Sequence, residues 1–100
     1  MKLEKKIQLK NMEQDREVTE RLVEENLSGK LDKYLQKLDG DDVEGEVALV
    51  LEKNKTDRFN GTLNVLVDGK TFYYAREDYK NLADLINHLF DHLKEDLGKI

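Results

Sequence analysis

Apolar residues change their spacing along this chain, and the order of these changes limits the folds that the chain can form. Over residues 2–12 and 43–75, apolar and polar residues alternate, which is typical of strands with one buried face. Over residues 19–38 and 78–97, apolar residues recur every three or four positions, which is typical of amphipathic helices. The chain has no proline to interrupt either helix. The sequence therefore predicts the element order β-α-β-β-β-α.

The first predicted strand lies within residues 2–12, and a helix follows it. Thr19 is expected to cap the N-terminus of this helix, and Asp39-Gly40 to end it. Gly29 lies inside the helix and should weaken it by about 1 kcal/mol relative to alanine. The apolar stripe of this helix consists of Leu22, Val23, Leu27, Leu31, Tyr34, Leu35 and Leu38.

Three further strands are expected to form an antiparallel meander. Alternation over residues 43–51 and 59–67 predicts two strands, joined by the turn-forming residues 54–57. Asp68-Gly69 favours a tight hairpin turn, because both central positions of such a turn need positive φ, and a strand over residues 70–75 follows. A second helix is then expected to start at Asp78. Its apolar stripe consists of Tyr79, Leu82, Ala83, Ile86, Leu89, Phe90, Leu93 and Leu97.

Two amphipathic helices need a surface against which they can bury their apolar faces, and the four-stranded sheet is the only large one available. We therefore expect an α+β fold, a two-layer sandwich with both helices packed on one face of the sheet. The other face, with Thr62, Asn64 and Tyr73, should be more polar and exposed. A chain of 100 residues can bury one such core but not two, so residues 1–100 are predicted to form a single domain.

The composition excludes several classes of protein. Without cysteine, the chain cannot form a disulfide scaffold, a cysteine-ligated zinc site or a thiol nucleophile. The longest apolar run is Val47–Leu51, which is too short for a transmembrane helix or a signal-peptide core, so we expect a cytoplasmic protein with no membrane partner. The formal charge of −5 argues against binding nucleic acid by overall charge, and no DNA partner is predicted.

No motif in the sequence predicts an enzyme. The glycines are too widely spaced for a phosphate-binding loop, and Ser28, the only serine, lies in the middle of a predicted helix. Acidic pairs such as Glu24-Glu25 and Asp41-Asp42 are expected on solvated faces. His88 and His92 could chelate a metal with a third ligand, but the glutamate that usually follows the first histidine is absent. We predict a non-catalytic protein with no cofactor and no metal.

Short segments along the chain carry a resemblance to a known family. They are Val18-Thr19-Glu20, Lys30-Leu31-Asp32-Lys33-Tyr34, Glu52-Lys53, Val65-Leu66-Val67-Asp68-Gly69-Lys70 and Asp78-Tyr79. In this order, and with the predicted β-α-β-β-β-α arrangement, they resemble the ribosome hibernation promoting factors, also called ribosome-associated inhibitors or sigma-modulation proteins. The resemblance extends from Leu3 to about Glu95, and the length is similar to that of the short members of the family.

The resemblance implies a non-catalytic protein that inhibits translation in resting or stressed cells. Members of the family lie in the channel of the small ribosomal subunit, over the sites of messenger and transfer RNA. Their lysines and arginines on both helices and nearby loops contact phosphates of ribosomal RNA. By position, the resemblance gives this role to Lys30, Lys33 and Lys53, and four nearby cations are further candidates for rRNA binding. These are Arg58, Lys70, Arg76 and Lys94.

The second helix departs from the family pattern. The family typically has Tyr-Ala-Ala-Ile-Asp followed by a lysine and an arginine on the outer face, whereas this chain has residues 79–83 as Tyr-Lys-Asn-Leu-Ala. His88 and Asp91 stand where those cations would be, which should weaken RNA binding and its salt dependence. The alternative is a non-enzymatic module of the same fold that has lost rRNA binding. It would meet a basic protein partner through the outer side of this helix or through Asp41, Asp42, Glu44 and Glu46.

Overall fold

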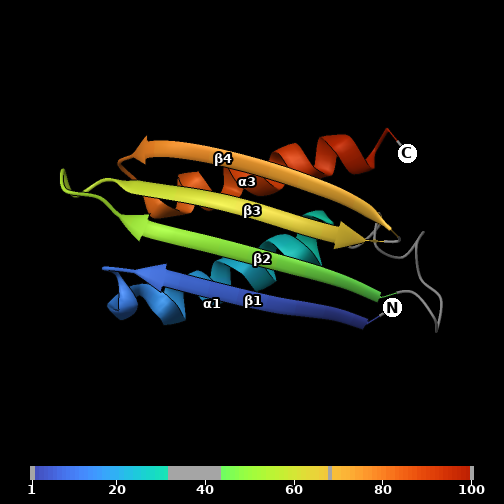
Figure 1. The fold of residues 1–100 in the computed structure, drawn as a ribbon, viewed down its shortest axis with the longest axis horizontal. Helices are drawn as coiled ribbons and strands as arrows, with labels where there is room; N and C mark the ends of the chain where they lie inside the picture. The colour runs from blue at the N-terminus through green and yellow to red at the C-terminus, as the bar shows by residue number, and fades with distance from the viewer. Residues whose placement is uncertain (1, 32–43, 68, 100) are drawn as a thin grey trace.

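Four strands form one sheet, and the helices cover one of its faces (Figure 1). The computed structural model describes residues 2–31, 44–67 and 69–99. Its elements are β1 (Lys2–Lys10), the 3₁₀ turn η1 (Glu13–Asp15), α1 (Arg16–Glu25), the π-helical turn η2 (Asn26–Lys30), β2 (Glu44–Lys53), β3 (Phe59–Val67), β4 (Lys70–Tyr79) and α3 (Leu82–Leu97). The predicted α+β fold and the order β-α-β-β-β-α are confirmed.

The strands lie in the order β1-β2-β3-β4, with β1 parallel to β2 and the other neighbouring pairs antiparallel. A side-chain cap stabilises the turn between β2 and β3, because Asn54 Oδ1 accepts hydrogen bonds from the backbone N–H of Thr56 (3.0 Å) and of Arg58 (3.1 Å). The turn predicted over residues 54–57 is therefore confirmed. At the predicted turn before β4, Gly69 has a φ of +74°, and Asp68 lies outside the described residues.

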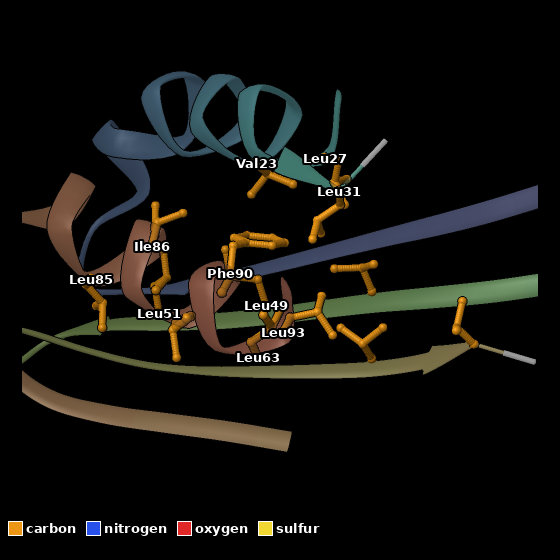
Figure 2. Packing of buried hydrophobic residues seen from close by; sticks show 14 of the residues in the cluster. Val23, Leu27, Leu31, Leu49, Leu51, Leu63, Leu85, Ile86, Phe90 and Leu93 are labelled. Carbon is orange, nitrogen blue, oxygen red and sulfur yellow. The ribbon is translucent and has the colours of Figure 1, made fainter. Parts of the chain in front are cut away.

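The core lies between the sheet and the helices (Figure 2). Val23 on α1 and Phe90 on α3 both point into this layer, toward the sheet residues Leu49 and Leu63. Leu49, Leu63 and Phe90 have no exposed surface, and Val23 is only 1% exposed. Both helices therefore pack on the same face of the sheet, as predicted, and the described part of the first stripe is buried there at Val23, Leu27 and Leu31. Tyr34, Leu35 and Leu38 of that stripe lie outside the described residues.

The first helix begins earlier than predicted. Thr19 is not its N-cap: α1 begins at Arg16, and Thr19 is fully buried inside it, with a hydroxyl that has no hydrogen-bond partner among the described residues. The reason is that Met12, which is also fully buried, anchors the chain at the core before the helix starts. Thr19 then lies one turn before Val23 on the buried side of the helix.

The same helix changes its winding where the sequence places Gly29. Over Asn26–Lys30 the backbone is π-helical, and the N–H of Leu31 bonds to the carbonyl of Asn26 at 3.2 Å. The Asn26 side chain is buried and donates to the Leu22 carbonyl (2.8 Å) and to Asn87 Oδ1 on α3 (3.0 Å). This contact ties the turn to α3. The predicted end of the helix at Asp39-Gly40 lies outside the described residues.

The second helix begins later than predicted, because the strand before it is longer. Asp78 is not the N-cap; that position belongs to Asn81, whose Oδ1 accepts from the Asp84 N–H at 3.1 Å. β4 continues to Tyr79, which pairs with Phe59, and the Asp78 N–H bonds to Asn60 Oδ1 at 3.0 Å. Pairing with the start of β3 thus holds residues 76–79 in the sheet.

The sheet face opposite the helices is open to solvent. Tyr73 is 63% exposed and Leu66 44% exposed on it, while Thr62 is half-buried and Asn64 exposed. The mixture of polar and apolar side chains agrees with the predicted exposed face. None of the described helices is both long and apolar enough to cross a membrane.

Candidate nucleic-acid interface

The cations predicted to bind RNA lie at both ends of the sheet. Lys53 is the last residue of β2 and pairs with Phe59, which in turn pairs with Tyr79 at the end of β4. Lys70 is the first residue of β4. Because a strand rises about 3.3 Å per residue, the two ends of β4 are about 30 Å apart. Lys53 and Lys70 therefore cannot contact the same phosphate, although one RNA segment could extend past both.

One group of cations surrounds the turn between β2 and β3. Lys53 Nζ lies 5.9 Å from the centroid of the Phe59 ring, which is a cation–π contact. Arg58 is half-buried. Its backbone N–H donates to Asn54 Oδ1, and its carbonyl accepts from the backbone N–H of Asn54. Lys55 is exposed between them. None of the three cations makes an ion pair within residues 2–31, 44–67 and 69–99, so their charges are available to an anion.

Sequence reasoning missed Lys55 as a candidate. The resemblance matched only Lys53 in this region, and Arg58 was added as a neighbour. The signal that could have found Lys55 is the spacing of Lys53, Lys55 and Arg58, three cations within six positions in and around a predicted turn. The structure brings all three to the end of the sheet where β2 ends and β3 begins.

The remaining lysines lie elsewhere. Lys70 and Lys94 are exposed, on β4 and α3, and neither has an ion pair among the described residues. Lys30 is the last residue of η2, at the end of the first helical segment. Lys33 lies outside the described residues. The cations matched by the resemblance are thus not gathered into one compact patch by the described part of the chain.

Arg76 is held in a contact with α3. Its Nη2 atom forms a hydrogen bond with His92 Nε2, and Nη1 donates to the Ala75 carbonyl at 2.7 Å. The His92 ring stacks on Tyr74, with centroids 5.9 Å apart and an interplanar angle of 24°. The Tyr74 hydroxyl donates to Asp96 Oδ2 at 2.6 Å. Burial, together with the Asp96 carboxylate, raises the pKa of Tyr74, so its hydroxyl stays protonated at physiological pH.

The other histidine of α3 has a different partner. His88 Nδ1 lies 2.7 Å from the Tyr79 hydroxyl oxygen, and the two rings meet edge to face with centroids 5.4 Å apart. Within the described ranges, no group of three or more histidine, cysteine, aspartate or glutamate side chains is arranged to hold a metal ion. His88 and His92 are thus each engaged by a residue of β4.

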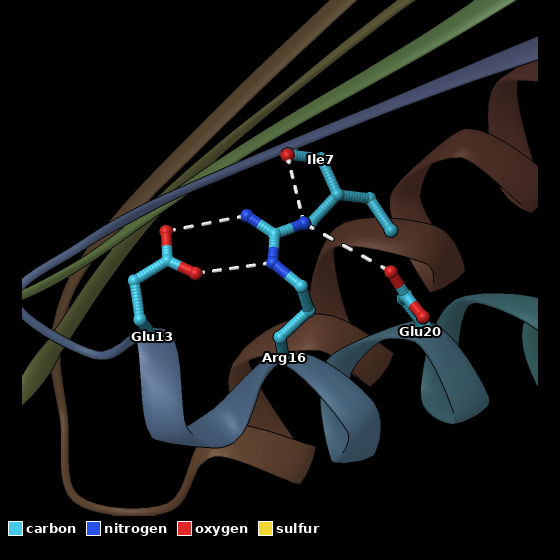
Figure 3. Close-up of polar contacts among 4 residues, drawn as sticks. All are labelled: Ile7, Glu13, Arg16 and Glu20. Carbon is cyan, nitrogen blue, oxygen red and sulfur yellow. Dashed lines mark hydrogen bonds and ion pairs between the residues drawn. The ribbon is translucent and has the colours of Figure 1, made fainter.

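Other cations near the N-terminus hold the fold together. Arg16 joins η1, α1 and β1 (Figure 3): its Nε and Nη2 donate to the Glu13 carboxylate at 3.1 and 3.3 Å, and its Nη1 donates to the Ile7 carbonyl at 3.4 Å. Lys5 forms an ion pair with Glu24, and Lys6 forms one with Glu46 at 2.9 Å. These side chains are engaged by acids of the chain itself and are weaker candidates for phosphate binding.

Solved structures that share this fold include two bacterial proteins. The first is the N-terminal domain of Protein Y from Thermus thermophilus, with a TM-score of 0.74 and 23% sequence identity over 99% of this chain and 98% of that one. The second is a ribosomal subunit interface protein from Coxiella burnetii, with a TM-score of 0.53 and 17% identity over 99% and 96%. The sequence matches no family model and no curated protein. At these identities the likeness is one of fold.

Proposed function

We propose that this chain, with the fold of the Protein Y N-terminal domain, is a hibernation promoting factor that binds the small ribosomal subunit and inhibits translation. The observation that carries the proposal is the fold match along nearly the whole of both chains. The second solved structure with this fold is named a ribosomal subunit interface protein. The segments that resemble the hibernation promoting factors extend over the same length of sequence.

The proposed mechanism is steric. In the channel that holds messenger and transfer RNA, a folded domain excludes both ligands, and no chemical step is required. Contacts would come from cations to phosphates of ribosomal RNA, with shape complementarity to the folded RNA providing selectivity. The proposed compartment is the cytoplasm, where the small subunit is found.

The proposed rRNA contacts use the cations at both ends of the sheet. Lys53 and Arg58, with Lys55 beside them, would bind phosphates at one end, and Lys70 at the other. Lys94 on α3 and Lys30 at the end of η2 would add contacts from the helical layer, and the resemblance adds Lys33. A spread of about 30 Å suits an extended RNA surface better than a single phosphate group.

Co-sedimentation with purified small ribosomal subunits tests the proposal. A salt series from about 50 to 300 mM should show saturable binding that weakens as salt rises, because each phosphate contact releases counterions. Initiator transfer RNA should compete for the site. If no binding occurs at the lowest salt, the ribosomal role is wrong, and the alternative of a basic protein partner is favoured.

A further inference from the structure

The hydrogen bond between Arg76 and His92 is possible in only one protonation state of the histidine. A guanidinium group has donors and no acceptor. His92 Nε2 must therefore accept the hydrogen bond from Arg76 Nη2, which requires a neutral ring with its proton on Nδ1. When Nε2 takes up a proton, the hydrogen bond breaks and two positive charges face each other.

His88 provides a contrast on the same helix. Its partner is the Tyr79 hydroxyl, which can either donate or accept. Protonation of His88 therefore keeps a hydrogen bond with this hydroxyl, with Nδ1 as the donor. Of the two histidines, His92 is the one whose protonation breaks its contact with β4.

The charged groups around His92 decide what happens to the two cations. From β4 it faces Arg76 and Tyr74, and the tyrosine stays neutral. From its own helix, Asp96 lies one turn away, but this carboxylate already accepts from Tyr74 and pairs with Lys99 at 4.0 Å. The other titratable groups within one turn of α3 are His88, Asp91, Lys94 and Glu95. The nearest carboxylate thus already has partners.

We propose that protonation of His92 releases Arg76 and that the two side chains then bind a phosphate of the RNA backbone together. The inference rests on the proposed function, since RNA is the ligand class that it supplies. An anion between the two groups favours the protonated ring, so binding takes up a proton. Affinity should therefore rise as pH falls through the range in which histidines change charge, about pH 5 to 8.

The site itself is tested by NMR with dimethyl phosphate, a phosphodiester whose single negative charge does not change between pH 6 and pH 8. In the wild-type protein, the Arg76 and His92 side-chain signals should respond at pH 6, with an affinity about tenfold higher than at pH 8. His92→Gln keeps an acceptor for Arg76 but cannot gain a proton, so its affinity should be low at both pH values. His88→Gln should behave like the wild type. Equal affinity at both pH values in the wild type, or a pH dependence that persists in His92→Gln, would overturn the proposal.

Small ribosomal subunits provide the second test. The wild type and His88→Gln should co-sediment more tightly at pH 6 than at pH 8, and His92→Gln should lose this difference. Equal binding of the wild type at both pH values overturns the pH dependence and leaves the proposed function intact. No ribosome binding at either pH, together with a pH-dependent response to dimethyl phosphate, overturns the proposed function and supports the phosphate site.

Discussion

At the scale of single residues, Arg16 shows how one side chain can join two elements. Its guanidinium bonds to Glu13 in η1 and to the Ile7 carbonyl on β1, an edge strand of the sheet. An edge strand has backbone groups that could pair with another chain. By occupying the Ile7 carbonyl, Arg16 both positions the start of α1 and satisfies part of that edge.

The Glu13–Arg16 contact predicts a pH dependence of stability. The hydrogen bond from Arg16 lowers the pKa of Glu13 below its ordinary value of 4.5. A carboxylate whose pKa is lower in the folded state stabilises that state above the unfolded pKa, and this contribution disappears as pH falls further. Glu13→Gln should therefore lose less stability than the wild type between pH 5 and pH 3.

Urea unfolding at a series of pH values measures this effect. Glu17→Gln is the matched control, since Glu17 is exposed on α1 and has no ion pair among the described residues. The control should follow the wild-type pH profile. If Glu13→Gln also follows it, the contact contributes nothing to stability.

Replacement of glycine by alanine is expected to change the free energy of unfolding in opposite directions at two positions. At Gly61, an added Cβ would lie 2.8 Å from Leu51 Cδ2 and 3.1 Å from Leu85 Cδ2, inside the core. Gly61→Ala should lower the free energy of unfolding by about 1 to 3 kcal/mol through overpacking. At Gly29 no atom of the described residues lies within 4 Å of the added atom, and Gly29→Ala should raise that free energy by about 1 kcal/mol. Chemical denaturation measures the free energy of unfolding of both variants. A Gly61→Ala variant that is more stable than the wild type would contradict the packing argument.

At the scale of elements, the start of α3 depends on one side chain. Asn81 Oδ1 satisfies the Asp84 N–H, one of the donors that a helix leaves unpaired at its first turn. Asn81→Ala should lower the free energy of unfolding by about 1 kcal/mol. Asn81→Asp, which keeps the acceptor, should retain nearly all of it. Thermal unfolding compares the variants, and equal losses in both would mean that the cap does not stabilise the helix.

The same element illustrates the limits of local signals. Asp78 and Asn81 are both good N-cap residues, and both precede the apolar stripe of α3. The choice between them depends on the pairing of Tyr79 with Phe59, which extends β4 past Asp78. Because Phe59 is 20 positions away in the sequence, no local pattern carries this information.

At the scale of the whole molecule, the separation of the cations makes the two ends of the sheet independently testable. Lys53→Gln with Arg58→Gln removes two charges at one end, and Lys70→Gln removes one at the other. For each phosphate that a variant no longer binds, the salt dependence of ribosome binding should fall by about one unit of slope. Co-sedimentation across the salt series measures the slope for each of the two variants. Unchanged slopes in both variants would show that neither end contacts RNA.

Controls for these variants come from the chain itself. Lys6→Gln removes one charge from the open face of the sheet, where Lys6 pairs with Glu46, and should leave the slope unchanged. The positions that the family resemblance assigns to the first helical segment are tested by Lys30→Glu with Lys33→Glu. This double variant should abolish ribosome association while circular dichroism shows an intact fold. Association at wild-type strength would remove both lysines from the proposed interface.

The sequence by itself determined the class of fold, because the periods of apolar residues are set by neighbours within a few positions. Alternation over β3 correctly predicts a strand, and the three- and four-residue spacing in α3 correctly predicts a helix. Asn54, a residue favoured in turns, accepts a backbone hydrogen bond within the turn that it belongs to. These features follow from local backbone geometry.

The tertiary structure decided which distant residues meet. Burial of Met12 moved the start of α1 ahead of Thr19, and the pairing of Tyr79 with Phe59 extended β4 past Asp78. The contact of Arg76 with His92 joins an edge strand to a helix across 16 positions. Such contacts depend on how the helical layer packs on the sheet, which is a property of the whole core and not of any short segment.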